Sequence, residues 1–535
     1  MTEDGTVRDA TAESVGPATL ADSPAGLARP LAGPSGAAAD AARRRWLILA
    51  VIGLAQLMVV LDATIVNIAL PSVQHSLVFS TSERSWVITA YALAFGGLLV
   101  VGGRLSDLVG RKRTFVAGLA GFAIASAAGG AAPDFAALIA ARAVQGAFGA
   151  LLAPSALALL TTTFTDPRER GKALGIYTAI AGGGGAIGLI LGGVLTEYLS
   201  WRWCLYVNVA FAAAALAGAI PLVRNQPRNP GASLDIPGSL LAVSGLAAIV
   251  FGFSQASSDG WGSALTLGPI VAGVLLLLSF VAVERRVARP LVPLGIIGNR
   301  TRGTAYLGAV IAGIGLIGMF LLITYYLQGV LGFSPLRAGL AFLPFVAGIV
   351  VAANFVSNVG LTRFGPKIVV PIGMIAAAVA SAWLTGIGVH GGYGTHVAPA
   401  LVVMGLGVGG VVTGAFSLGP AGARPADTGV AAALVNSSNQ VGGSLGAALL
   451  NSIAATVAAG YVAGHGPLAA TVHGDNVAFT VLVALFAAGA VATALLYPRR
   501  QASRSVLLGA LSLEVVNVAG DSADGRDRIQ SAPNL

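Results

Sequence analysis

The chain has 535 residues, of which 56% are hydrophobic and 10% are charged, whereas soluble domains carry about 25% charged residues. The net charge of +9 does not indicate nucleic-acid binding, because the basic residues stand in short clusters between apolar runs. The single cysteine, Cys204, excludes an intramolecular disulfide, and the five histidines lack metal-ligand spacing, so no metal site is expected. This composition predicts a polytopic membrane protein in contact with the lipid bilayer.

The chain opens with residues 1–42, which are rich in Ala, Gly, Pro and Ser and are predicted to form a disordered cytoplasmic tail. The cluster Arg43-Arg44-Arg45 is expected to hold the N-terminus inside as the first span inserts. Roughly fourteen apolar runs of membrane-spanning length follow, so the predicted fold class is an all-α polytopic membrane protein. The predicted spans are 46–70, 85–103, 114–131, 135–160, 173–195, 203–223, 236–254, 265–284, 304–329, 338–358, 367–389, 397–419, 439–462 and 477–497.

The charges between these runs predict an orientation. Loops on one side carry basic clusters, such as residues 111–113 and 168–170, whereas loops on the other side hold only Arg84, Arg202 and Arg337. This asymmetry follows the positive-inside rule. Because the number of spans is even, both termini are expected in the cytoplasm, with the protein in the cytoplasmic membrane.

Two charged residues lie well inside predicted spans. Asp62 belongs to VVLDATIVNIALP in the first span, and Arg142 belongs to the fourth. At a rise of 1.5 Å per residue, they lie roughly 12 Å and 10 Å below the same surface. The two could meet across an interior cavity, where a proton, the Arg and a substrate would compete for the carboxylate. A static ion pair that fixes helix packing is the alternative.

The segment GGRLSDLVGRKR, residues 102–113, forms the predicted inner turn between the second and third spans. Gly103 and Gly110 are expected to permit a tight turn there. Asp107 can accept hydrogen bonds from backbone amides at a helix N-terminus or from Arg111. A basic loop by itself is usually a topology signal, but this Gly, Asp, Gly, Arg spacing is more specific.

That spacing resembles the loop signature GxLxDxxGRK of the major facilitator superfamily. LDATIVNIALP resembles the first-helix signature of its drug:proton antiporters with fourteen spans, RAVQGAFGALLAP resembles the fourth-helix signature, and WRWCLYVNV resembles the segment entering the sixth helix. The resemblance covers about residues 45–500 and implies two six-helix bundles around a central cavity. The bundles would be 43–223 and 304–497, joined by a linker, 224–303, with two extra spans, and followed by a cytoplasmic tail, 498–535.

The resemblance also implies residue roles. By position, Asp62 and Arg142 correspond to residues implicated in substrate or proton coupling, and Gln145 belongs to the same signature as Arg142. Asp107 and Arg111 correspond to the pair that latches the inner face closed in the outward-open state.

Three departures from the family pattern stand out. In the fifth helix Gly188, Gly192 and Gly193 remain from the export signature, but Leu189 stands where antiporters carry Pro. In the second bundle, Thr362 occupies the position that corresponds to Asp107, so the latch is expected to depend mainly on the first bundle. Asn439 replaces an expected Arg in the thirteenth span.

Several polar residues in the spans are candidates for lining the cavity. Interhelical hydrogen bonds that serve packing are an equally open interpretation for them. The candidates are Asn67, Gln145, Tyr325, Gln328, Asn436 and Gln440.

Together these features predict proton-coupled efflux of amphipathic or cationic small molecules by alternating access. The expected partners of the protein are the substrate and protons. The proton gradient is expected to supply the driving force without any cofactor, and the protein is expected to be a monomer. Uptake or facilitated diffusion of a small nutrient is the alternative, which the Leu189 departure keeps open. An enzyme is not expected, because the acidic residues are dispersed and Cys204 has no His close in sequence.

Overall fold

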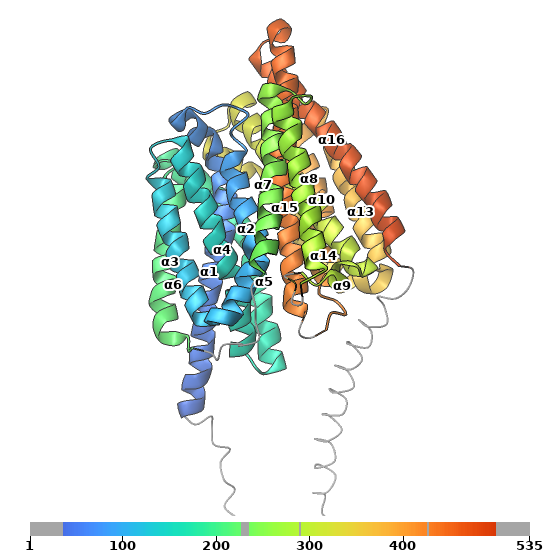
Figure 1. Ribbon diagram of the computed structural model, residues 1–535. Helices are drawn as coiled ribbons and strands as arrows, with labels where there is room; N and C mark the ends of the chain where they lie inside the picture. Colours follow the sequence, from blue (N-terminus) through green and yellow to red (C-terminus); the bar gives the residue numbers. More distant parts are fainter. Residues whose placement is uncertain (1–35, 226–234, 288–289, 291, 425–426, 499–535) are drawn as a thin grey trace, which may run out of the picture. The chain divides into compact units, whose positions relative to one another are not determined.

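The computed structural model describes residues 36–225, 235–287, 290, 292–424 and 427–498, and within them it contains helices and no β-strand (Figure 1). The chain separates into two compact units, Met1–Arg44 and Arg45–Leu535. All contacts described below lie within the second unit. The predicted tails fall largely outside the described residues, but residues 36–42, expected in the disordered tail, are helical.

The first six helices are α1 (Gly36–Leu77), α2 (Trp86–Val109), α3 (Arg111–Gly130), α4 (Phe135–Thr163), α5 (Pro167–Tyr198) and α6 (Trp203–Leu222). The middle of the chain contains α7 (Ile236–Asp259), α8 (Ala264–Glu284) and the short α9 (Leu294–Ile297). The remaining helices are α10 (Arg300–Tyr325), the π-helix η1 (Tyr326–Val330), α11 (Pro335–Ala341), α12 (Leu343–Phe355), η2 (Val356–Phe364), α13 (Pro366–Leu384), η3 (Tyr393–Val397), α14 (Ala398–Leu418), α15 (Thr428–His465) and α16 (Pro467–Leu496).

The predicted number of spans agrees with these helices. Among the described residues, 13 helices are long and apolar enough to cross a membrane. The remaining predicted span coincides with α3, a helix of 20 residues whose mean hydropathy is lowered by its basic first turn and its glycines. The all-α membrane fold class is therefore confirmed.

Several helix ends differ from the predicted ones. The helix α15 begins at Thr428 rather than at 439, and α16 begins at Pro467 rather than at 477. Conversely, α13 ends at Leu384, before the predicted end at 389. Apolar runs mark the part of a helix that suits lipid, whereas the hydrogen-bonded helix continues through polar turns until a cap or a glycine ends it. The correction at α16 moves Asp475 from a predicted loop into a helix.

Side-chain caps account for many helix starts. Asp134 accepts a hydrogen bond from the amide of Ala137 at the start of α4, and Asp166 accepts from two amides at the start of α5. Ser263 and Asn299 do the same for α8 and α10. Each cap satisfies amides that have no partner within the helix.

Two names are used below for the ends of the helices. The arginine-rich end is the end where α2 meets α3 and α4 meets α5, with the basic residues at 111–113 and 168–170. The opposite end contains the connections at residues 78–85, 131–134 and 199–202.

The helices α7 and α8 pair with each other, and α7 packs along both α2 and α15 (Figure 1). Near the opposite end, the indole of Trp86 donates to the hydroxyl of Ser254, at 2.8 Å, and the hydroxyl of Ser452 donates to the carbonyl of Phe253. The extra pair therefore contacts helices from both halves of the chain.

Candidate functional site

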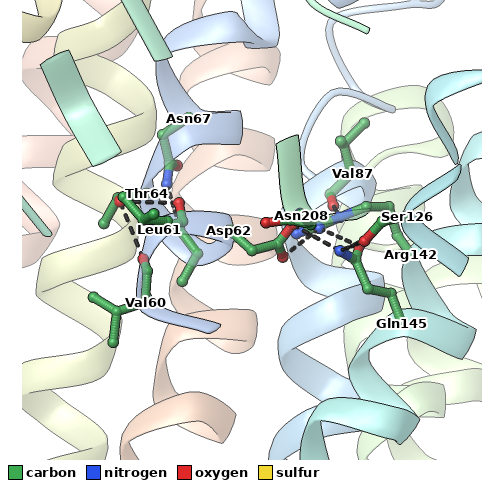
Figure 2. A network of polar contacts seen from close by, with 11 residues as sticks. Val60, Leu61, Asp62, Thr64, Asn67, Val87, Ser126, Arg142, Gln145 and Asn208 are labelled. Carbon is green, nitrogen blue, oxygen red and sulfur yellow. Dashed lines mark hydrogen bonds and ion pairs between the residues drawn. The ribbon is translucent and has the colours of Figure 1, made fainter. Parts of the chain in front are cut away.

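The carboxylate of Asp62 is the centre of a buried polar network (Figure 2). Arg142 Nη1 lies 2.7 Å from Oδ2 and forms an ion pair with it. Oδ1 accepts from Gln145 Nε2 at 2.7 Å and from Asn208 Nδ2 at 2.8 Å. Asp62 and Arg142, which were predicted to lie at a similar depth, do meet, but they contact each other directly rather than across an open cavity.

Arg142 is fixed from three further directions. Its Nε donates to the carbonyl of Val87 at 3.1 Å, and its Nη1 also donates to Gln145 Oε1 at 2.6 Å. The guanidinium carbon lies 4.5 Å from the ring centroid of Tyr91, a cation–π contact. With only 2% of its surface exposed, Arg142 relies on these groups in place of water.

The network forms because separate helices present short polar side chains at one level. Arg142 and Gln145 are three residues apart and therefore share a face of α4. Gln145 Nε2 also donates to the hydroxyl of Ser126 on α3, at 2.6 Å, while Asn208 comes from α6. Gly146 lets α4 approach α2 closely, because an added Cβ would overlap the Tyr91 carbonyl oxygen.

The pattern of donors is that of an ionised carboxylate, since every group that contacts Asp62 donates to it. A proton on Oδ1 would displace one of its two donors, whereas Oδ2, which accepts only from Arg142, would hold the guanidinium less strongly once the carboxyl group is neutral.

A small cavity adjoins Arg142 on the side of the opposite end. Its lining is apolar apart from Arg142 and the thiol of Cys204. The other lining residues come from α1, α2, α4 and α6 and from the turn before α6, and they are Val66, Ala69, Val73, Val87, Leu138, Trp201 and Leu205. Of the polar residues expected to line a cavity, none lies here.

Sequence reasoning missed Asn208, Ser126 and Tyr91. Asn208 is fully buried in an otherwise apolar helix, and its Oδ1 has no hydrogen-bond partner among the described residues. The polar side chain in the quoted segment WRWCLYVNV was the available signal. Ser126 and Tyr91 gave none, because both are common in helices without any binding role.

The loop signature forms the connection between α2 and α3 at the arginine-rich end. Gly110 has φ 107°, a value that favours glycine, and separates the two helices. Arg111 Nη2 lies 3.8 Å from Asp107 Oδ1, and both side chains are about a third exposed, at 31% and 41%. The two predicted latch residues therefore face each other in this conformation.

The role predicted for Gly103 in that turn is wrong. The helix α2 continues to Val109, so Gly103 is helical, and an added Cβ would make an ordinary 3.7 Å contact with Pro154. The close approach is made by Gly102, where an added Cβ would overlap the Ala150 carbonyl oxygen on α4.

This pair of glycines gives a matched prediction. We expect Gly102→Ala to destabilise the protein by about 1–3 kcal/mol, because the backbones of α2 and α4 must separate. We expect Gly103→Ala to be neutral or stabilising by up to about 1 kcal/mol, since Ala is the better helix former. Thermal unfolding of the two variants in one detergent checks this, and equal melting temperatures would contradict it.

The export-signature glycines pack α5 on two sides. Gly188 and Gly192 face α1, where an added Cβ at Gly192 would lie 2.8 Å from the Ile65 carbonyl oxygen. Gly193 faces α11 instead, with Leu336 Cα 2.6 Å from an added Cβ. Leu189 is buried, and its carbonyl group closely approaches Gly339 of α11. The segment therefore joins the two halves of the chain through backbone contact.

The predicted cavity-lining residues do not surround one space in this conformation. Asn67 donates to the Ala63 carbonyl of its own helix, and Gln145 contacts Asp62. Near the opposite end, the Tyr325 hydroxyl donates to Gln74, and Gln328 Nε2 donates to the Ile68 carbonyl at 2.9 Å, so both join α10 or η1 to α1.

The last two candidates lie on α15. Asn436 and Gln440 are half-buried there, and Gln440 packs against Gly96 of α2. A lining role for these polar residues stays a prediction.

Comparison with known proteins identifies the family. The family model described as the Major Facilitator Superfamily matches residues 52–447. The chain belongs to this superfamily.

Named relatives of this Major Facilitator Superfamily protein include resistance and export proteins. It is 50% identical over 449 residues to the puromycin resistance protein pur8 of Streptomyces alboniger, covering 83% of this chain and 89% of that protein. It is 38% identical over 402 residues to the cephamycin export protein CmcT of Amycolatopsis lactamdurans, covering 75% and 83%. It is 35% identical over 438 residues to the tetracenomycin C resistance and export protein of Streptomyces glaucescens, covering 81% and 79%.

Solved structures agree with the superfamily fold. The structure of a bacterial homolog of the human lysosomal transporter Spinster, in its inward-facing and unoccupied conformation, matches with a TM-score of 0.61 and 17% identity. The match covers 87% of this chain and 98% of that one. The predicted family and membrane fold are confirmed.

Proposed function

We propose that this superfamily member exports amphipathic or cationic small molecules in exchange for protons. The observation that carries the proposal is the buried ion pair of Asp62 and Arg142, because a carboxylate in that position could bind a proton in place of the guanidinium. The printed functions of the relatives, resistance to puromycin and export of cephamycin, support a natural product or drug as the substrate. No cofactor is needed, because the proton gradient supplies the driving force.

Coupling would follow from competition at Asp62. A proton that arrives from outside would weaken the hold of Asp62 on Arg142, and substrate would then leave. Loss of that proton towards the cytoplasm would restore the network and favour capture of a cation. Each charge moved across 100 mV changes the driving force by about 2.3 kcal/mol, so the net charge moved per cycle limits the gradient that can be built.

Alternating access would occur by rocking of residues 43–223 against residues 304–497, with the linker at 224–303. Contacts between these parts near the opposite end support this division: Leu336 N donates to Glu197 Oε2 at 2.9 Å, and Gln328 contacts the Ile68 carbonyl. Towards the arginine-rich end, the glycines of α5 at positions 171, 175, 182 and 183 are exposed, with nothing within 4 Å of an added Cβ. This conformation is the one expected to take up substrate from that end.

We further propose that the protein lies in the cytoplasmic membrane as a monomer, with the arginine-rich end and both termini in the cytoplasm. The positive-inside rule supports this orientation.

Efflux from cells tests the proposal. Energised cells that express the protein are loaded with the cationic dye ethidium, and the decay of its fluorescence is followed before and after an uncoupler collapses the proton gradient. We expect faster efflux than in cells without the protein, and loss of that difference after uncoupling. Net dye entry into right-side-out vesicles would instead support the uptake alternative, which was kept open by Leu189.

The latch is a separate part of the proposal. We expect Asp107→Asn to favour the conformation in which the arginine-rich end is open and to lower turnover, because the residue that would close that end loses its charge. Cysteines introduced along α5 should then react faster with a polar thiol reagent added on that side. Unchanged reactivity would contradict the latch.

A further inference from the structure

A second buried polar cluster joins the two halves of the chain at the opposite end. Arg84, in the connection between α1 and α2, is 4% exposed and donates through Nε to Asn451 Oδ1 on α15. Asn451 Nδ2 in turn donates to the Thr81 carbonyl at 2.9 Å. The Arg84 guanidinium carbon lies 4.0 Å from the centroid of the Tyr325 ring on α10, and the Tyr325 hydroxyl donates to Gln74 on α1. These residues are called the Arg84 lock.

Sequence reasoning placed Arg84 in an outer loop, and the structure shows that its side chain is buried there. Burial lowers the pKa of Arg84 from its ordinary value, but an arginine starts so high that it keeps its charge at neutral pH. The lock therefore contains a fixed positive charge.

Asp475 on α16 is the carboxyl group beside this lock. It is 1% exposed, and its Oδ2 has no hydrogen-bond partner in the described part of the chain. Arg84 attracts it electrostatically, but among the described residues the two do not form an ion pair within 4.0 Å, and Arg84 Nε donates to Asn451. Tyr326 of η1 is a further titratable group near Asp475, and its hydroxyl donates to the Gly388 carbonyl.

We propose that Asp475 is a second proton-binding site, occupied when the Arg84 lock is closed. An ionised carboxylate that is buried without a donor on one oxygen is costly, whereas the neutral acid is not. When the lock opens, water reaches the carboxyl group and the anion becomes favourable. Closing this end therefore takes up a proton from the compartment that the opposite end faces.

A proton site at Asp475 would favour one direction of the transport cycle, and this inference rests on the proposed exchange of substrate for protons. After substrate leaves at the opposite end, acid in that compartment would load Asp475 and favour closure of the Arg84 lock. The same compartment supplies the proton that is exchanged. Asp62 would carry the proton that is exchanged for substrate. Asp475 would make closure of the Arg84 lock depend on the availability of protons in that compartment.

Distance measurements without substrate or gradient test the site. Spin labels are attached to Val78→Cys and Ala459→Cys, two exposed positions on either side of the lock, in a Cys204→Ala background. The fraction of molecules in which the two spin labels lie close together is measured between pH 5 and pH 9. We expect it to increase as the pH falls, and we expect Asp475→Asn to lose this dependence. Because no transport is measured, failure of the export proposal would not affect the result.

Three control variants assign the pH response. Asp62→Asn should keep it, which separates the two proton sites. Asp134→Asn neutralises an exposed helix cap at the same end and should also keep it. His473→Gln removes an exposed ring that stacks on Tyr461 near the site, and a lost response in that variant would assign the effect to histidine instead. The melting temperature of Asp475→Asn shows whether this variant is folded. An unaltered pH response in the folded variant would overturn the proposal. The proposal would also be overturned if the distance between the labels did not change with pH in the protein that retains Asp475.

Discussion

Replacing Asp62 with Asn is expected to reduce dye efflux to the level of cells without the protein. The amide cannot bind a proton, and its NH2 group must face either Arg142 or the pair Gln145 and Asn208, which donate and need an acceptor. Arg142, only 2% exposed, would lose the carboxylate that compensates its burial. Both the exchange chemistry and the position of the guanidinium would therefore be lost.

The measurement is the initial rate of efflux at matched protein levels. Asp134→Asn is the matched control, because it makes the same chemical change at an exposed cap where Asn is equally favourable. The control should transport at the normal rate. Normal, uncoupler-sensitive efflux by Asp62→Asn would show that Asp62 serves packing alone.

Replacing Arg142 with Gln is expected to give the largest loss of stability. It leaves the Asp62 charge buried with two amide donors, and removing one partner of a buried ion pair costs about 3–5 kcal/mol. The cation–π contact with Tyr91 and the hydrogen bond to the Val87 carbonyl are lost as well. The melting temperature of the purified protein in detergent reports this change.

The double variant Asp62→Asn with Arg142→Gln separates stability from transport. With both charges removed, we expect most of the lost stability to return, since neither charge of the Asp62–Arg142 pair remains without its partner. Transport should stay absent. If the double variant were as unstable as Arg142→Gln alone, the ion pair would not be the source of the loss, and restored transport would refute the coupling role.

Much of the fold and the centre of the site could be predicted from the sequence. A carboxylate is so unfavourable in an apolar run that Asp62 stood out at once, and helix rise alone placed it level with Arg142. The membrane-spanning helices could also be predicted, because lipid requires long apolar helices.

The rest of the fold and of the site depends on contacts between residues far apart in the chain, which the pattern of polar and apolar residues does not reveal. Asp475 was placed in a loop, because hydropathy ends where polar residues begin, whereas α16 starts earlier and includes it. Arg84 does lie in a loop, but its burial against Asn451 could not be predicted from the sequence. Which of two adjacent glycines touches α4 depends on the rotation of α2, so Gly102 could not be told from Gly103. Asn208 reaches Asp62 only through packing of α6, a contact between residues far apart in sequence.

The measurement that most directly tests proton-coupled export through Asp62 is substrate-driven proton flux. Inverted membrane vesicles with an acid interior are monitored with a pH-sensitive dye, and puromycin is added outside, on the cytoplasmic face. The account predicts that puromycin enters the vesicles and partly collapses the proton gradient, and that Asp62→Asn vesicles show neither effect. Puromycin accumulation without any proton movement would contradict the account.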